Sequence, residues 1–542
     1  MLSYRKLAMR VLGRPLHTGG SDSPRPASQR AAAFILTAAM LTSLTAPAFA
    51  ETWFIENGDI TISAGNTEGT NKVSQGTTIV EDDTNTTITN SNKDKASSHT
   101  VTIKAENEND KVEVKLEDVN IDTSSRNKAA VSVTGEGDTN IKLDGDNALK
   151  SDIYRSGIYG SGSGSLTISG GENDSLTAQG GSGANGISSS GSLTISGGTV
   201  TANGDDGGRG ISSSGSVTIS GGSTVTANGG NGTISGGDGI CSSGGVTISG
   251  GSTVTANGGN GGSLVGGDGI RSGGGLTVSD GTVTAKGGNG DSKDGYGGDG
   301  IRSGGVVTIS GNTVNAAGGY GGKVGGYGIC SFDRVAISGG TVEAAGGNGS
   351  TGGGSGIYSS VIDLSGSLEL TVKAGSPNGK ALSQKGSELV LDTIKDKLGP
   401  GAKVTTTDAD GETKEVSIPV EPEGPVIPEE SSSSSDGGSA TPSAPASTHP
   451  GLTVTDKSGA VIDSISTQSG NTLTICTGRF TASLRASLAT LRQLRAEGID
   501  TITFQTILCS TTLSVDELLA MGGEDAEAVL THRLTASSLT VG

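Results

Sequence analysis

Apolar residues alternate with serine and threonine in short runs along most of this chain, which is the period of a β-strand with one buried face. The runs recur in a unit that repeats from about Gly157 to about Ala374, and residues 186–204, GISSSGSLTISGGTVTANG, show it clearly. Its Gly-Ile pair returns every 24 to 31 residues, at Ile158, Ile187, Ile211, Ile240, Ile270, Ile301, Ile329 and Ile357. In six units the isoleucine and the alanine of the TVTA-type segment are 15 or 16 residues apart, so length changes collect in a Gly-rich remainder.

Each run is too short to form a sheet with the next run in sequence, because Gly-Gly and Ser-Gly pairs typical of bends separate them. A run can therefore pair only with its copy in the next unit. This pattern predicts an all-β fold, a right-handed parallel β-helix with three sides, in which stacked coils complete each other's core. A disordered Gly/Ser-rich segment is the alternative, and the in-register alternation disfavours it. The side chains expected to point inward in one coil are Ile240, Val246, Ile248, Val254 and Ala256.

The first fifty residues are predicted to be a signal peptide. Basic residues precede an apolar run from Ala31 to Leu44, and residues 48–50, Ala-Phe-Ala, supply the small-x-small pattern of a cleavage site. The run is shorter than the about 20 residues that cross a membrane comfortably. We therefore expect residues 1–50 to be removed on export, a secreted or cell-surface bacterial protein, and no membrane span.

Three further segments follow from the pattern. Residues 51–416 are predicted to form one β-helix domain, with the region of Trp53 covering the first coil and residues 389–398 in a C-terminal cap. Residues 417–450, rich in proline and serine, are predicted to be a linker. Residues 451–542 are predicted to form a small α+β domain of unknown role.

The predicted α+β domain has its own spacing. Leu484, Leu488, Leu491 and Leu494 recur at helical intervals before Gly498, which predicts an amphipathic helix with a glycine stop. We also expect strands at residues 473–476 and 501–508 and a second helix at residues 515–521.

The net charge limits the binding partners, and the cysteine positions limit the disulfides. Removing residues 1–50 changes the net charge from −19 to −24, and so acidic a chain repels nucleic acid and anionic lipid. Cys241 and Cys330 occupy the same slot three coils apart, about 14 Å, which is beyond the reach of a disulfide. Whether Cys476 and Cys509 pair stays open, since it depends on the compartment.

A column of aspartates precedes the Gly-Ile pair in three consecutive coils, at Asp238, Asp268 and Asp299. Like charges stacked about 5 Å apart repel each other, so something should compensate them. A calcium ion is one answer, which makes the three aspartates candidate metal ligands and calcium a candidate cofactor. A solvated charge ladder is the other, because Arg271 and Arg302 follow Asp268 and Asp299 by three residues.

Six tyrosines beyond residue 50 lie in loops or beside the Gly-Ile pair, where we expect side chains to face outward. Exposed aromatic rings can stack on the apolar faces of sugars. Tyr296, Tyr320 and Tyr327 lie in loops that flank two adjacent coils, and they are our candidate carbohydrate-binding residues. The alternative is that these tyrosines only cover their own loops.

Catalytic motifs are not apparent in the sequence. His99, His449 and His532 are isolated along the chain, and no nucleophile motif is found. Lyases and hydrolases built on β-helices need clustered carboxylates, whereas the loop acids Asp205 and Asp291 are weak candidates. We therefore expect no enzymatic activity, with a polysaccharide lyase as the third-ranked function.

The segment at residues 112–150, VEVKLEDVNIDTSSRNKAAVSVTGEGDTNIKLDGDNALK, precedes coils of the type GIxSxGxxTISGGTVTA. Together they resemble the carbohydrate-binding β-helix family of secreted proteins from polysaccharide-using anaerobic bacteria, over residues 60–382. The resemblance implies a right-handed parallel β-helix, non-catalytic binding of plant polysaccharides such as cellulose or pectin, and bound calcium, but it supplies no fixed ligand residues. The leading prediction is an exported, monomeric, polysaccharide-binding protein; the alternative is a structural or adhesin-type surface protein with the solenoid as a rigid spacer.

Overall fold

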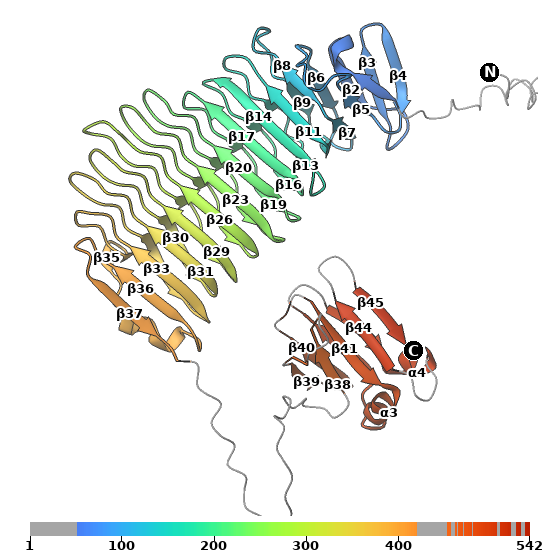
Figure 1. Ribbon diagram of the computed structural model, residues 1–542, viewed down its shortest axis with the longest axis vertical. Coiled ribbons are helices and arrows are strands. Elements are labelled where there is room, and N and C mark those ends of the chain that lie inside the picture. The colour runs from blue at the N-terminus through green and yellow to red at the C-terminus, as the bar shows by residue number, and fades with distance from the viewer. Residues whose placement is uncertain are drawn as a thin grey trace, which may run out of the picture. The chain divides into compact units, whose positions relative to one another are not determined.

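The computed structural model describes residues 51–419 and, with gaps, residues 452–541. The chain divides into two compact units, residues 1–425 and 426–542, and the described residues of the first, 51–419, form a parallel β-helix (Figure 1). The predicted signal peptide and residues 420–450 of the predicted linker lie outside the described residues. No helix in the described part of the chain is long and apolar enough to cross a membrane.

Three columns of strands run along the β-helix, and each typical coil adds one strand to each column. The first column contains the Gly-Ile pairs. Its strands are β2 (Ile60–Ala64), β6 (Val101–Ala105), β9 (Val131–Gly135), β12 (Ile158–Gly160), β15 (Ile187–Ser189), β18 (Ile211–Ser213), β21 (Ile240–Ser242), β24 (Ile270–Ser272), β27 (Ile301–Ser303), β30 (Ile329–Ile337), β32 (Ile357–Leu364) and β34 (Leu382–Gln384).

The second and third columns contain the two alternating runs of each unit. The second column is β1 (Thr52–Phe54), β5 (Thr87–Thr89), β7 (Lys111–Glu117), β10 (Asp138–Asp144), β13 (Leu166–Ser169), β16 (Leu193–Ser196), β19 (Val217–Ser220), β22 (Val246–Ile248), β25 (Leu276–Val278), β28 (Val307–Ile309) and the later parts of β30 and β32. The third column is β8 (Asn120–Asp122), β11 (Asp146–Lys150), β14 (Ser175–Ser182), β17 (Thr199–Asp205), β20 (Thr224–Asn228), β23 (Ser252–Asn257), β26 (Gly281–Lys286), β29 (Asn312–Ala317), β31 (Gly340–Ala345), β33 (Leu368–Lys373) and β36 (Lys403–Thr407).

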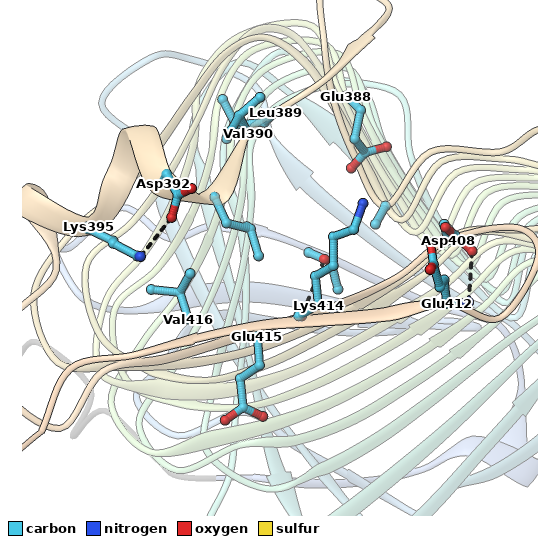
Figure 2. Close-up of a pocket in the computed structure, with 13 residues that line it drawn as sticks. Glu388, Leu389, Val390, Asp392, Lys395, Asp408, Glu412, Lys414, Glu415 and Val416 are labelled. Atoms are coloured by element: carbon cyan, nitrogen blue, oxygen red, sulfur yellow. Dashed lines mark hydrogen bonds and ion pairs between the residues drawn. The ribbon is translucent and has the colours of Figure 1, made fainter.

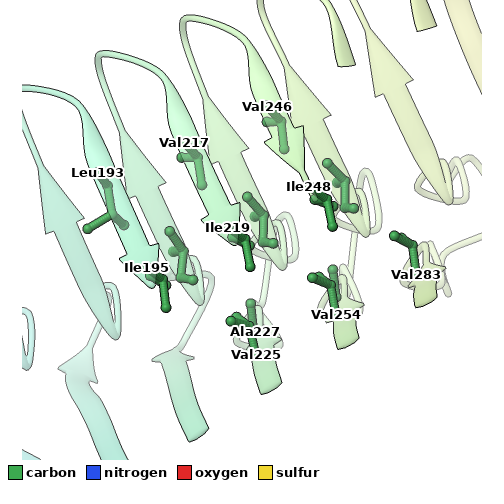
Figure 3. Close-up of a cluster of buried hydrophobic side chains, with 14 of the residues drawn as sticks. Leu193, Ile195, Val217, Ile219, Val225, Ala227, Val246, Ile248, Val254 and Val283 are labelled. Carbon is green, nitrogen blue, oxygen red and sulfur yellow. The ribbon is translucent and has the colours of Figure 1, made fainter. Parts of the chain in front are cut away.

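Equivalent residues of successive coils lie side by side, which confirms the predicted solenoid. Val217 in the second column pairs with Leu193 on one side and with Val246 on the other, and Figure 3 shows these side chains in a row inside the coils. The five residues predicted to point inward in one coil are all buried. Burying one apolar row per strand is therefore what holds the coils in register.

The abundant glycine reflects tight stacking of the Gly-rich loops. A Cβ atom added at Gly237 would lie 1.9 Å from the carbonyl oxygen of Gly208 in the preceding coil, and one at Gly267 would lie 1.9 Å from that of Gly237. No side chain fits at such distances, so these two positions require glycine for close backbone approach. The loops are ordered layers of the solenoid.

Antiparallel strands close both ends of the β-helix. At the N-terminal end, β2 pairs with β3 (Asn71–Gln75), which pairs with β4 (Thr78–Asp83). Trp53 is buried beside this cap, and its indole Nε1 donates a hydrogen bond of 3.1 Å to Oδ2 of Asp83. The short 3₁₀ helix η1 (Ile55–Asn57) follows β1.

At the C-terminal end, β36 pairs in antiparallel fashion with β37 (Thr413–Ser417), and β34 pairs with β35 (Ser387–Glu388). The region predicted to be a cap contains the 3₁₀ helix η2 (Leu391–Lys397), which buries Ile394 against the last coils.

The described residues of the second unit form two four-stranded sheets and two helices. One sheet has the order β38–β41–β44–β45 and the other β39–β40–β42–β43. The elements are β38 (Leu452–Thr455), β39 (Ile465–Ser469), β40 (Thr472–Cys476), β41 (Ala482–Ser487), α3 (Leu488–Ala496), β42 (Thr501–Gln505), β43 (Ser510–Ser514), α4 (Val515–Met521), β44 (Glu527–His532) and β45 (Ser537–Val541).

One part of the predicted amphipathic helix was wrong. Leu484 lies in strand β41, where Leu484 and Ala486 are both buried and follow the period of two. The helix begins only at Leu488, after Ser487, whose Oγ caps it by accepting from the backbone N–H of Thr490 at 3.1 Å. The second predicted helix, residues 515–521, is present as α4.

The cysteines of the β-helix are unpaired. Cys241, Arg271, Arg302 and Cys330 are successive neighbours in the first column, so the two cysteines lie three coils apart as predicted. Cys509 lies outside the described residues, so its pairing with Cys476 is not tested.

Candidate functional site

A groove of about 570 Å³ crosses five consecutive coils of the β-helix. At about 4.8 Å per coil, its length along the solenoid axis is roughly 19 Å. Backbone of the glycine-rich loops forms much of its surface, and the charged side chains that line it are Arg209, Asp238, Asp268, Arg271 and Arg302. The groove therefore contains two of the three predicted aspartate ligands.

The aspartate column is tied together by hydrogen bonds between coils. The backbone N–H of Asp268 donates to Oδ1 of Asp238 at 2.9 Å, and that of Asp299 donates to Oδ1 of Asp268 at 2.8 Å. Tyr327 continues the column, because its N–H donates to Oδ1 of Asp299 at 2.7 Å. Each carboxyl group thus fastens its own coil to the next one.

Two of the three carboxylates also form ion pairs. Nε of Arg209 lies 3.2 Å from Oδ2 of Asp238, and Nη1 of Arg302 lies 3.3 Å from Oδ2 of Asp299. Among the described residues, Oδ2 of Asp268 has no hydrogen-bond or ion-pair partner, and Arg271 forms no ion pair. The middle position of the column is therefore the one that is not neutralised within the protein.

The predicted solvated charge ladder needs two corrections. The aspartates are buried, with exposed fractions of 4 to 6%, because the Gly-rich loops fold over them. The pair of Arg302 with Asp299 forms as predicted, but Arg271 does not pair with Asp268. Sequence reasoning missed Arg209, although it precedes a Gly-Ile pair and so occupies the same column one coil before Asp238.

Burial changes the protonation of the column. Removal from water, together with the neighbouring charges of Asp299 and Asp238, raises the pKa of Asp268 to about 8. Burial also raises the pKa of Asp299 to about 6, against the lowering effect of the Tyr327 N–H and of Arg302. At neutral pH the Asp268 carboxyl is therefore mostly protonated, and its hydroxyl can donate a hydrogen bond.

The aspartate column offers few free oxygen donors for a calcium ion. Calcium takes six to eight oxygen ligands, whereas Asp238 and Asp299 use both carboxylate oxygens for N–H groups and arginines. No cluster of three or more His, Cys, Asp or Glu side chains that could hold a metal is found in the described part of the chain. The column offers calcium one unpaired oxygen, on Asp268, and calcium binding stays a prediction.

The three candidate tyrosines fall into two environments. Tyr296 and Tyr320 are exposed by 43% and 47%, and Nζ of Lys323 lies 5.6 Å from the centre of the Tyr296 ring. Tyr327 is half-buried, and its ring stacks on that of Tyr358 with centroids 5.1 Å apart. The structure thus leaves Tyr296 and Tyr320 accessible and uses Tyr327 within the stack.

An exposed apolar edge, formed by Ile234, Leu264, Val265 and Tyr296, runs along the variable loops beside the groove. Its backbone continues from coil to coil, since Leu264 N–H donates to the Ile234 carbonyl at 2.9 Å and Tyr296 N–H to the Leu264 carbonyl at 2.8 Å. Sequence reasoning missed the aliphatic members. Their signal was a large apolar residue inside an otherwise Gly-rich loop.

A separate hollow of about 490 Å³ lies at the C-terminal cap, between η2 and the β36–β37 hairpin (Figure 2). Charged side chains of this hollow form contacts within the cap: Lys395 pairs with Asp392 at 2.7 Å, and Oδ1 of Asp408 accepts the N–H of Glu412 at 2.9 Å. We therefore interpret the hollow as a structural feature of the cap and not as a ligand site.

The histidines differ in their surroundings. His99, predicted to be isolated, lies 3.2 Å from Asp59, which also pairs with Arg126 and Lys128 from a later coil. His532 is buried in the second unit beside Phe504. The Asp59 cluster joins the first coils of the solenoid by charge.

Comparisons of the chain with protein-family models, with curated proteins and with solved structures found no match. The resemblance to the carbohydrate-binding β-helix family therefore stays a prediction, and function is argued from the geometry of the site.

Proposed function

We propose that this chain is an exported, non-catalytic polysaccharide-binding protein that holds its ligand along the variable-loop edge of the β-helix. The observation that carries the proposal is the exposed apolar edge, and Tyr320 is a second exposed tyrosine on the next coil. Large apolar side chains exposed on successive coils are typical of interaction surfaces. Because the edge and the adjacent groove both run along the solenoid axis, they suit a long, linear ligand.

Sugar stacking would supply the contact. Aromatic rings offer flat apolar faces of the size of a sugar ring, and Tyr296 and Tyr320 expose theirs on neighbouring coils. The hydroxyl groups of a glycan can bond the serine and threonine side chains that face outward on the strands. In this proposal the protein is monomeric, and its partner is a plant-type polysaccharide.

Substitution of Tyr296 and Tyr320 by alanine tests the proposal. A glycan array on residues 51–542 identifies the ligand, and calorimetry compares the variants on it. Each lost ring should weaken binding by about 1 kcal/mol, while the melting temperature stays nearly constant because the two side chains lie on loops. Phe54→Ala, which removes an exposed aromatic ring in β1 at the N-terminal end of the solenoid, is the control.

The outcomes separate the three functions. If the protein is a structural or adhesin-type spacer, neither the wild type nor the double variant would bind a soluble glycan. A lyase would release unsaturated sugars that absorb in the ultraviolet. Glycan binding that the double variant retains in full would contradict the tyrosine platform. Tyr327→Ala belongs in a separate variant, since losing its stack on Tyr358 should also reduce stability.

A further inference from the structure

We propose that the groove contains an oxyanion site, in which Arg271 binds a carboxylate or a sulfate group. The ligand is an anionic group on an acidic polysaccharide or a free oxyanion of the same chemistry. The polysaccharide source rests on the proposed function above, whereas the anion site itself does not.

The charges of the groove carry the proposal. The chain has a net charge of −19, yet three arginines line this one groove. Arg209 is paired with Asp238, and Arg302 with Asp299, so two positive charges are neutralised. Arg271 is exposed and has no ion pair among the described residues. A guanidinium with free donors recognises a carboxylate or sulfate through two parallel hydrogen bonds.

Asp268 lines the same groove as Arg271 and forms no ion pair with it in the described structure. Its side chain is 6% exposed, its Oδ1 already accepts the N–H of Asp299, and it lines the groove with Oδ2 unpartnered in the described structure. With the pKa of Asp268 raised to about 8, the carboxyl is mostly neutral at pH 7. The groove then offers an anion one guanidinium and one O–H donor.

The residues paired with Arg271 in the first column carry no negative charge. In the first column Arg271 stands between Cys241 and Arg302. Burial raises the pKa of Cys241 to about 11 and that of Cys330 to about 12, so both thiols are neutral. Two like charges on paired strand positions repel each other, and the ion pair of Asp299 is formed with Arg302. A bound anion would compensate Arg271.

The same arrangement makes binding depend on pH. As the pH rises through about 8, Asp268 loses its proton and becomes a carboxylate that lines the groove, so the groove becomes more negative and repels an anion. The charged groups around this carboxylate, Asp238, Asp299, Arg209 and Arg302, are held in two ion pairs, Arg209 with Asp238 and Arg302 with Asp299. Affinity for an anion should therefore fall between pH 7 and pH 9.

The test measures binding by calorimetry at low ionic strength on residues 51–542. The probes are sodium sulfate, an oligosaccharide of uronic acids, and a neutral oligosaccharide of the same length. We expect Arg271→Gln to weaken binding of the anionic probes about tenfold or more, the scale of lost charged hydrogen bonds, and Arg271→Lys to have an intermediate effect. Lys286→Gln, at an exposed lysine on the third column, is the control.

Asp268→Asn provides the second arm. This variant keeps a neutral side chain at all pH values, so its binding at pH 9 should equal its binding at pH 7. Binding of sulfate and the acidic oligosaccharide alike indicates a site for the oxyanion itself; binding of the oligosaccharide alone assigns it to the polysaccharide. The proposal is overturned if wild type binds neither anionic probe, if Arg271→Gln binds as well as wild type, or if affinity rises with pH.

The two proposals fail separately. If the Tyr296/Tyr320 variant loses neutral-glycan binding but still binds anions, the result bears on the tyrosine platform only. If Arg271→Gln loses anion binding but still binds neutral glycan, the result bears on the anion site in the groove only. Melting curves of each variant show that it is folded.

Discussion

The backbone N–H of Asp299 donates a 2.8 Å hydrogen bond to Oδ1 of Asp268, one coil earlier in the solenoid. An oxygen of a carboxyl group accepts this bond whether or not the other oxygen carries a proton. The contact between the two coils therefore persists when Asp268 titrates, and a change of pH alters the charge of the groove without opening the stack.

Stability should fall with pH over the range in which the column titrates. The folded pKa values of Asp268 and Asp299, about 8 and about 6, lie above the unfolded value of about 3.9, so the folded chain binds more protons in between. This stabilisation is complete below about pH 4 and is lost as the pH rises through 6 and 8, by at most about 1.4 kcal/mol per pH unit and group.

Urea unfolding between pH 5 and pH 9 measures this dependence. Asp268→Asn should flatten the slope above pH 6, because Asp268 is the group that titrates there, and Asp94→Asn at an exposed site should leave it unchanged. An equal slope in Asp268→Asn and wild type would show that another group is responsible.

Calcium binding would require Asp268 as an ionised carboxylate, whereas the anion site requires its protonated form. If the column binds calcium, millimolar calcium raises the melting temperature by mass action, and Asp268→Asn abolishes the gain. The measurement is a thermal melt with calcium and with chelator. An unchanged melting temperature leaves the arginine pairs and the protonated Asp268 as the account of the column, and a gain that Asp268→Asn removes would count against the anion site.

The buried rows should tolerate no charge. Ile248 is fully buried in β22, so Ile248→Asp places an unpaired carboxyl in the core and should cost several kcal/mol of unfolding free energy. Thr247→Asp, one residue earlier on the outward face of the same strand, should cost less than about 1 kcal/mol. Similar losses in the two variants, measured by urea unfolding, would contradict the assignment of the two faces.

Whole coils should be removable. Deleting residues 239–268 brings Ile270 next to Ile211 and Leu276 next to Val217, which preserves every column. Because each coil contacts only its neighbours, we expect a shorter solenoid that unfolds cooperatively with an unchanged β signal per residue. Deleting residues 239–253 breaks the register and should prevent folding of that region. Circular dichroism and urea unfolding of both deletions decide the matter.

The alternation of apolar and small polar residues was sufficient to predict the coils and their inward side chains, because burial of one row per strand determines the register. The helix of the second unit was predicted one turn too long at its start, since Leu484 and Leu488 fit a helical interval while Leu484 and Ala486 fit a strand. Only packing against the neighbouring strands of the sheet separates these two patterns.

The position of the aspartate column could be predicted from the sequence, but its surroundings could not. Repeat alignment places Asp238, Asp268 and Asp299 in one column, and it could also have placed Arg209 there. It could not show that the column is buried, because burial depends on how loops of different length fold over it. The choice of Arg302, and not Arg271, as an ion-pair partner depends on side-chain geometry that spacing does not determine.

The reversal of strand direction at both ends has a consequence for self-association. Parallel strands stacked in register expose a sheet edge at each end, and such edges readily pair with another copy to form fibrils. Here β3 reverses direction beside β2 and β37 beside β36. The strands that end these two caps, β4 and β37, carry acidic or mixed charges, Glu81, Asp82 and Asp83 in one and Lys414 and Glu415 in the other. Such ends resist addition of a further strand. The repeated sequence of the solenoid could otherwise continue from molecule to molecule, so we expect the two caps to disfavour end-to-end pairing of copies.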